Sequence, residues 1–250
     1  MKNNKSLGQH WLNNRVVLDE IASLAKTPDD VSLVVEIGPG LGTLTSSLLR
    51  NFNRVVAVEF DTHLATNLPK SFPGKNLEVI NKDILKFDFD EISERYAVAG
   101  NIPYYITSPI IERLLTTKNI PARIVLLVQK EVAERIADDK ETMLSLFVKN
   151  RASVALGPVV KKNEFTPPPK VDSRVIVLAP HSSGPIFPDE IFKVIAQAFS
   201  APRKKLIHNL TPLASKEKLT DIFNELQLNL DARPSDLHLG DYFNLWRKLN

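Results

Sequence analysis

The chain has 250 residues, of which 43% are hydrophobic, and its formal net charge is only +3. This length suits one large domain together with a smaller one, and it allows a core that buries roughly 70–75% of the unfolded surface. The absence of cysteine excludes disulfides, thiolate nucleophiles and cysteine-ligated zinc sites. The five histidines show no metal-ligand spacing, so we expect no metal.

No segment of the sequence predicts a membrane span or a secretion signal. The longest purely aliphatic run covers residues 124–128, whereas a membrane helix needs about 20 apolar residues. Residues 1–6 lack the apolar core of a signal peptide. We therefore expect a soluble, cytoplasmic protein.

A glycine-rich loop follows the first strongly predicted strand. Residues 32–37 form a β-branched run, residues 43–49 have a helical pattern, and Gly38, Gly40 and Gly42 lie between them. Glycines at such a turn let the backbone approach a ligand closely. The spacing is one residue shorter than a dinucleotide pyrophosphate site needs, so it favours a nucleoside cofactor without phosphates, such as S-adenosylmethionine.

Acidic residues end the next two predicted strands. Glu59 follows the strand at residues 54–58, where a carboxylate can bind ribose hydroxyls. Asp83 follows the strand at residues 77–81 and could accept the amino group of the cofactor's adenine, while Ile84 packs beside the ring. A plain helix cap is the alternative for Asp83.

The fourth predicted strand, at residues 97–100, delivers Asn101, Pro103 and Tyr104 to its carboxyl end. The side-chain oxygen of Asn101 and a main-chain carbonyl beside Pro103 can accept both protons of an adenine N6 amine. Tyr104 can stack on the same base. The alternative is a turn in which proline sets φ and asparagine caps the next helix. Residues that can bind a ligand end four successive predicted strands, and helix capping alone does not explain this succession.

A proline-rich loop presents Phe165. Prolines at residues 167–169 hold the loop extended, which lowers the entropic cost of presenting the ring to a ligand. A ring opposite Tyr104 would sandwich an extruded base. The alternative is that Phe165 simply anchors the loop in the core.

The remaining patterns complete an α/β domain and then become purely helical. Strands are predicted at residues 124–128, 152–160 and 174–179, and helices at residues 16–25, 108–115, 129–135 and 142–150. Further helices are predicted at residues 188–199, 203–210, 216–226 and 239–249. We predict an α/β domain with a Rossmann-like sheet and helices on both faces in residues 1–183, and a small all-helical domain in residues 184–250.

Two basic clusters indicate contact with a phosphate backbone. Between residues 149 and 174, six basic residues stand against two acidic ones. A solvated face is the alternative for such clusters, but a phosphate backbone is their usual specific partner. The candidate RNA-binding residues are Lys161, Lys162, Lys170, Arg203, Lys204 and Lys205.

Taken together, these residues resemble the ribosomal RNA adenine dimethyltransferases over essentially the whole chain. The resemblance is to the KsgA type, the branch that acts on small-subunit RNA. The segments around Phe165 and Arg203 favour this branch over the large-subunit resistance methylases. The matching residues are 8–12, 36–42, 59, 61, 83, 101–104, 129–132, 165–173, 203–205 and 209.

The resemblance implies that residues 1–183 form a Rossmann-like, S-adenosylmethionine-dependent methyltransferase domain and that the helical residues 184–250 bind RNA or the ribosome. The implied reaction is dimethylation at N6 of two adjacent adenosines in the 3′-terminal hairpin loop of 16S rRNA, by direct in-line transfer. Asn101 and Tyr104 would hold the target adenine, with Phe165 on its other face. The implied partners are the RNA and the immature small subunit, and a monomer suffices. The implied cofactor residues are His10, Leu12, Gly38, Glu59, Asp83 and Asn101.

Two other functions stay open: a 23S rRNA adenine N6-methyltransferase that confers antibiotic resistance, and a non-catalytic small-subunit assembly factor. A complete cofactor site argues against a pure binding protein. The chain also departs from the family's usual pattern. Tyr105 stands where asparagine is common, Trp11 where phenylalanine is common, and His208 replaces an arginine. Of these changes, Tyr105 places a bulky ring beside the target site.

Overall fold

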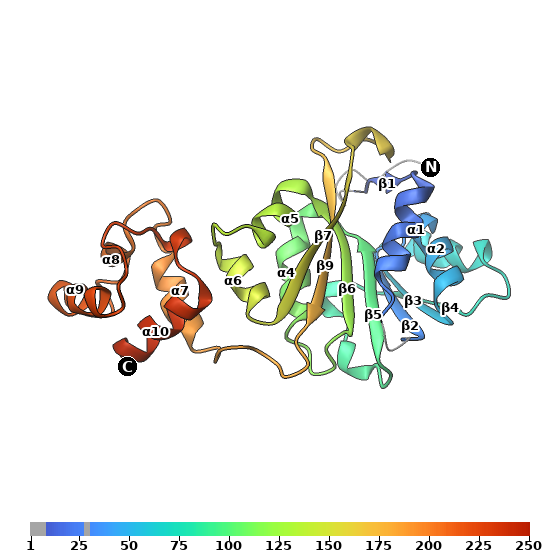
Figure 1. The fold of residues 1–250 in the computed structure, drawn as a ribbon. Helices are drawn as coiled ribbons and strands as arrows, with labels where there is room; N and C mark the ends of the chain where they lie inside the picture. The colour runs from blue at the N-terminus through green and yellow to red at the C-terminus, as the bar shows by residue number, and fades with distance from the viewer. Residues whose placement is uncertain (1–8, 28–30) are drawn as a thin grey trace. The chain divides into compact units, whose positions relative to one another are not determined.

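Figure 1 shows a computed structural model of the chain, which describes residues 9–27 and 31–250. Gly8 of the amino-terminal motif and the segment at residues 1–6 lie outside the described residues. The strands are β1 (Trp11–Leu12), β2 (Leu33–Ile37), β3 (Arg54–Glu59), β4 (Leu77–Asn81), β5 (Tyr96–Asn101), β6 (Arg123–Gln129), β7 (Ala152–Val160), β8 (Phe165–Thr166) and β9 (Ser173–Pro180). The helices are α1 (Arg15–Leu24), α2 (Thr43–Asn51), α3 (Thr62–Asn67), α4 (Thr107–Leu114), α5 (Lys130–Ala137), α6 (Met143–Lys149), α7 (Ile191–Ala198), α8 (Leu206–Asn209), α9 (Lys216–Glu225) and α10 (Leu239–Leu249).

Seven strands form one mixed sheet in the order β4-β3-β2-β5-β6-β9-β7 (Figure 1). β2 pairs in parallel with β3 on one side and with β5 on the other, while β4 and β6 extend the parallel part. β9 pairs antiparallel with β6. The chain therefore leaves β2 towards one edge of the sheet and later returns to its other side. Ligands bind at the carboxyl ends of the strands at such a reversal. The predicted α/β class is confirmed.

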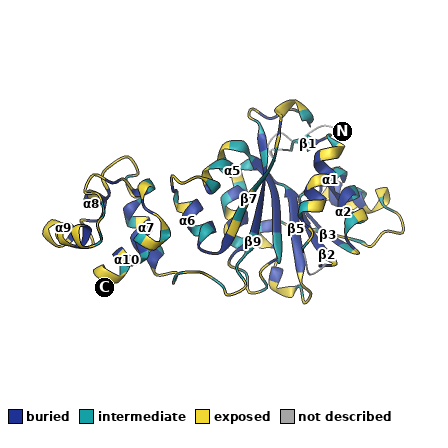
Figure 2. Ribbon diagram, viewed as in Figure 1, coloured by how far each residue is buried: buried dark blue, intermediate teal, exposed yellow. Residues whose placement is uncertain are grey.

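The central strands are buried on both faces because helices flank the sheet (Figure 2). Val125, Leu126 and Leu127 of β6 are completely buried, as expected for an apolar strand covered on both sides. On one face, α1 and α2 contribute Ile21 and Leu48 to the core. Burying each such side chain stabilises the fold by about 1.5–3 kcal/mol.

The chain divides into two compact units, Met1–Ala133 with Ser153–Pro180, and Glu134–Ala152 with His181–Asn250. The core of the second unit combines Leu146 of α6 with apolar side chains of α7, α8, α9 and α10. Residues 184–250, predicted as a helical domain, thus fall within this unit, which also includes residues 134–152. The boundaries of separately folding domains stay a prediction.

One helix of the second unit is shorter than the pattern predicts. The sequence predicts a helix over residues 203–210, whereas α8 covers only Leu206–Asn209. The reason lies in the Asn209 side chain, whose Nδ2 donates to the carbonyl oxygens of Ala198 at 2.6 Å and Ala201 at 2.9 Å. These bonds tie the last residue of α8 to the end of α7 and to the turn that follows it, and this turn takes the place of the first part of the predicted helix.

The lengths of the helices can be compared with the length that a membrane-spanning helix needs. The longest helix within the described ranges, α10, has 11 residues. None of the helices there has the length and apolar composition that crossing a membrane would require.

Gly42 generates a prediction about stability. It begins α2 in a left-handed conformation with a φ of 84°, and a Cβ there would lie 2.7 Å from Leu68 Cδ1 and 2.8 Å from Phe72 Cε2. Gly42→Ala should lower the free energy of unfolding by about 2–5 kcal/mol, because the left-handed conformation and the overpacking each cost free energy. Urea denaturation measures this change.

Gly74→Ala is the matched control for Gly42→Ala. Gly74 has a similar φ of 71°, but no heavy atom lies within 4 Å of its Cβ position. In Gly74→Ala the free energy of unfolding should fall only by the cost of the left-handed conformation, about 1–2 kcal/mol. Equal losses in the two variants would contradict a steric role for Leu68 and Phe72.

Candidate active site

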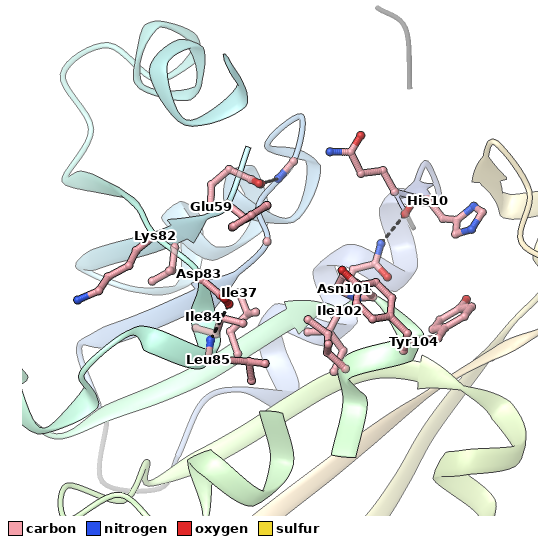
Figure 3. Close-up of a pocket in the computed structure, with 18 of the residues that line it drawn as sticks. His10, Ile37, Glu59, Lys82, Asp83, Ile84, Leu85, Asn101, Ile102 and Tyr104 are labelled. Atoms are coloured by element: carbon pink, nitrogen blue, oxygen red, sulfur yellow. Dashed lines mark hydrogen bonds between the residues drawn. The ribbon is translucent and has the colours of Figure 1, made fainter. Parts of the chain in front are cut away.

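A cavity of about 330 Å³ opens at the carboxyl edge of β2, β3, β4 and β5 (Figure 3). This volume is at the lower end of the range for small-molecule sites. Its wall consists of the segments that follow these strands, together with an amino-terminal segment: residues 9–11, 37–38, 40, 58–60, 82–85 and 101–106. The lining includes all but two of the predicted cofactor and catalytic residues, namely His10, Gly38, Gly40, Glu59, Asp83, Ile84, Asn101 and Tyr104.

Glu59 joins the ends of β2 and β3. Its Oε2 accepts a hydrogen bond from the Gly40 N–H at 3.0 Å, and its Oε1 accepts one from the Asp61 N–H at 2.8 Å. Burial raises the pKa of Glu59, while these backbone donors act in the opposite direction. Each oxygen keeps a further lone pair, so the carboxylate can still accept hydrogen bonds from a ligand's hydroxyl groups.

Asp83 combines the two roles that the sequence left open. Its Oδ1 accepts a hydrogen bond from the Leu85 N–H at 3.0 Å and caps the short 3₁₀ helix Ile84–Lys86. The residue also lines the cavity, as does the buried Ile84 (Figure 3). One carboxylate oxygen is thus occupied by capping, and the other can accept a ligand's amino group.

Asn101 is oriented by the amino-terminal segment. Its Nδ2 donates to the His10 carbonyl oxygen at 2.7 Å (Figure 3). The His10 ring lies 2.7 Å from the Pro167 carbonyl oxygen through Nδ1, which must carry the proton because a carbonyl only accepts. Within the described residues, Oδ1 of Asn101 has no hydrogen-bond partner. The amide therefore offers an acceptor of fixed direction.

The Tyr104 ring is immobilised at both ends. Its hydroxyl lies 2.6 Å from Ser173 Oγ. Its ring stacks on His10, with centroids 6.2 Å apart and an interplanar angle of 21°. Burial raises the pKa of Tyr104, so the phenol stays protonated at neutral pH. A half-buried ring with little freedom can offer one face to a planar ligand at low entropic cost.

Leu12 and Phe165 lie outside the cavity lining. They face each other across β1 and β8, which pair antiparallel, and both belong to the core, with exposures of 1% and 2%. Side chains alternate along a strand, so Trp11, the neighbour of Leu12, lines the cavity instead. The structure thus has Phe165 anchoring its loop. Stacking of Phe165 on a base stays a prediction that requires the ring to leave the core.

The predicted RNA-binding residues differ in their surroundings. Lys161 pairs with Asp172 at 3.0 Å, and Lys205 pairs with Asp231. All six are exposed; Lys161, Lys162 and Lys170 belong to the first unit, and Arg203, Lys204 and Lys205 belong to the second. The lysine side chains of both ion pairs are exposed, so these pairs are weak and can exchange for phosphate contacts.

Two residues near the site were not assigned a role from the sequence. Trp11 covers the glycine loop, since a Cβ on Gly40 would lie 3.0 Å from its Nε1. Glu36 is 1% exposed, immediately before Ile37 of the lining, and neither of its oxygens makes a hydrogen bond of normal geometry among the described residues. The signal for Glu36 was present as an acid within an apolar strand, whereas the contact of Trp11 is non-local.

Glu36 is the most strongly perturbed acid near the cavity. Burial raises its pKa to about 8, the nearby Thr45 hydroxyl acts to lower it, and the charge of Glu59 raises it further. Its carboxyl is therefore largely protonated at neutral pH. In the part of the chain that the structure describes, no cluster of three or more histidine and carboxylate side chains is arranged to hold a metal ion.

Solved structures with the same architecture define the class of protein. A dimethyladenosine transferase from Plasmodium falciparum has a TM-score of 0.80 and 28% identity, with 94% of this chain and 96% of that chain covered. The 23S rRNA methyltransferase ErmE has a TM-score of 0.77 and covers 96% of this chain and 99% of its own, at 24% identity. The fold is that of the Rossmann-like methyltransferases.

The family follows from sequence comparison. The model of the ribosomal RNA adenine dimethylase family matches residues 1–250, and this chain belongs to that family. Two relatives are named ribosomal RNA small subunit methyltransferase A. The one from Mycoplasmopsis pulmonis is 35% identical, with 100% of both chains covered. The one from Synechocystis sp. is 39% identical, with 96% of this chain and 94% of the relative covered.

Glu36 predicts a pH dependence of stability. Its folded-state pKa of about 8 lies above the ordinary value of 4.5, so between these values the folded protein binds a proton that the unfolded chain releases. The free energy of unfolding should therefore fall as pH rises through this window, by up to about 1.4 kcal/mol per pH unit. In Glu36→Gln that part of the slope should vanish, as urea denaturation across the window would measure.

Glu78→Gln serves as the control for Glu36→Gln. Glu78 lies on β4 with a side-chain exposure of 51%, and its ion pair with Arg54 at 2.8 Å is exposed and therefore weak. In Glu78→Gln the free energy of unfolding should change with pH as steeply as it does in the wild-type protein. A Glu36→Gln protein with an unchanged slope would show that Glu36 is ionised in the folded state.

Proposed function

We propose that this chain dimethylates N6 of two adjacent adenosines in the 3′-terminal hairpin loop of small-subunit ribosomal RNA, with S-adenosyl-L-methionine as methyl donor. The observation that carries the proposal is the gathering of Gly40, Glu59, Asp83 and Asn101 from four strand ends in one cavity beside Tyr104. Membership of the family supports the reaction, and the name of the relatives supports the small subunit as the target.

The donor groups of the cavity fit S-adenosylmethionine. Glu59 can accept the ribose hydroxyls, because the backbone N–H groups of Gly40 and Asp61 leave each of its oxygens with a further lone pair. Asp83 can accept the adenine amino group with its second oxygen, while Ile84 packs beside the ring. Gly38 and Gly40 let the backbone approach the ligand. When bound, the cofactor supplies a methyl group activated by a sulfonium.

The target adenine would bind between Asn101 and Tyr104. Oδ1 of Asn101, which has no hydrogen-bond partner among the described residues, can accept one proton of the N6 amine, and the carbonyl oxygen next to Pro103 can accept the other. Both bonds draw the lone pair of the nitrogen away from the ring and direct it outwards. The fixed ring of Tyr104 stacks on the base and holds this orientation.

In this proposal, most of the rate enhancement comes from holding the methyl donor and the target amine in line. Holding two reactants in line can remove about 7–11 kcal/mol from a barrier. The chain needs no general base, because the methylated amine is acidic enough to lose its proton to water. An unpaired hairpin loop suits such a site, since a base that is neither paired nor stacked in a duplex costs least to extrude.

Two alternatives are weaker. The likeness to ErmE, at 24% identity, extends to the fold and does not favour the large subunit as target. A non-catalytic assembly factor would have no need for Glu59 and Asp83 at the carboxyl edge of the sheet. Lys170, Arg203 and Lys204 are exposed and could contact phosphates under either alternative, so they do not discriminate.

Glu59→Ala tests the cofactor site. Losing charge-assisted hydrogen bonds should weaken S-adenosylmethionine binding by about 10- to 100-fold in isothermal titration calorimetry. Glu112→Ala, which removes an exposed carboxylate from α4, is the matched control and should bind normally. Unchanged affinity in Glu59→Ala would remove Glu59 from the proposed site.

Mass spectrometry of nucleosides tests the reaction. Unmethylated small subunits incubated with the wild-type protein and labelled S-adenosylmethionine should yield labelled N6,N6-dimethyladenosine. Asn101→Ala should reduce the rate by about 100-fold or more, because it removes the acceptor that orients the amine. Cofactor binding without methyladenosine would support the assembly factor instead. A parallel reaction with large subunits completes the test, since label found only in large-subunit RNA would support the 23S enzyme.

A further inference from the structure

Tyr104 and Tyr105 are adjacent in the chain but have opposite environments. Tyr104 is half-buried and held by Ser173 and His10. Tyr105 also lines the cavity, yet it is 66% exposed. Among residues 9–27 and 31–250, it has neither a hydrogen-bond partner nor a ring partner. Nothing in the described fold depends on this second ring.

The local backbone explains why the two tyrosine rings have different environments. Residues Tyr104–Ile106 form a 3₁₀ helix directly after Pro103. With three residues per turn, neighbouring side chains point about 120° apart. When Tyr104 is directed towards His10 and Ser173, Tyr105 must therefore point elsewhere, and its exposure places it at the solvent side of the cavity. The turn thus presents one rigid ring inside the cavity and one accessible ring at its mouth.

An accessible ring at this place can contact the nucleotide next to the target. A base that enters the cavity leaves its neighbour in the strand at the mouth, where an unpaired base exposes an apolar face. Aromatic side chains bind such faces by stacking, which is sequence-tolerant. Tyr105 directly follows Tyr104, and the Cα atoms of neighbouring residues lie about 3.8 Å apart. Tyr105 is therefore next to the residue whose ring is proposed to hold the target.

We propose that Tyr105 is a stacking platform for the base adjacent to the target adenine in unpaired RNA. The inference rests on the proposed function and deepens it, because it assigns a site to the second of the two neighbouring bases. Stacking here would hold the strand while the target occupies the cavity.

A double-mutant cycle on RNA affinity tests the platform. The ligand is a labelled RNA hairpin with two adjacent adenosines in its loop, used intact or with either adenosine replaced by an abasic nucleotide. Tyr105→Ala should weaken binding of the intact hairpin by about 5- to 100-fold in fluorescence anisotropy. The abasic replacement at the neighbouring position should weaken wild-type binding similarly, and the two losses should not add.

Tyr105→Phe separates the ring from the hydroxyl. It should restore wild-type affinity for the intact hairpin, because stacking needs only the ring. S-adenosylmethionine affinity, measured by calorimetry, should stay within about twofold of wild type in both variants, because the cofactor's proposed hydrogen-bond partners are unchanged. Retained cofactor binding also shows that the variants are folded.

Several outcomes would overturn the inference. Additive losses, or a Tyr105→Ala protein that binds like wild type, would exclude stacking. A Tyr105→Phe protein as weak as Tyr105→Ala would assign the effect to the hydroxyl, and a parallel loss of cofactor affinity would assign the ring to the cofactor site. Methylation of small subunits by the same wild-type preparation decides whether the proposed function fails too, since that activity does not require the platform.

Discussion

The parallel register of β2 with β3 and β5 is the constraint on which the site depends. Ile37 lies opposite Val58 on one side and Gly100 on the other, so residues at the ends of these strands reach the same edge. At Gly100 a Cβ would lie 2.9 Å from the Ile37 carbonyl oxygen, and glycine therefore permits the close approach. The positions of Glu59 and Asn101 at the cavity follow from this register.

Buried carboxyl groups at this edge carry a cost in free energy. Glu59 has two backbone donors, whereas Glu36 has no hydrogen bond of normal geometry within the described residues, and burial raises the pKa of both. A positively charged ligand in the cavity would offset part of this cost. The proposed cofactor brings such a charge in its sulfonium, so the electrostatics of the cavity and the proposed chemistry agree.

The base-binding side of the cavity depends on segments far apart in the chain. His10 contributes its carbonyl oxygen to Asn101, its Nδ1 to the Pro167 carbonyl and its ring to Tyr104. One amino-terminal residue therefore orients the amide, the aromatic ring and the proline-rich loop together. Tyr105 is not part of this network because the 3₁₀ turn directs its side chain away from these residues. Its ring is therefore available to a second nucleotide.

Sequence alone determined the strands, the glycine loop and the acids at the strand ends, because side-chain periodicity and turn chemistry are local properties. It also predicted Glu59, Asp83 and Asn101 together, since parallel strands share one carboxyl edge. Tertiary structure alone decided that Phe165 lies in the core and that residues 134–152 pack with the second unit. Both depend on contacts between distant segments, such as the β1–β8 pair, which no local pattern encodes.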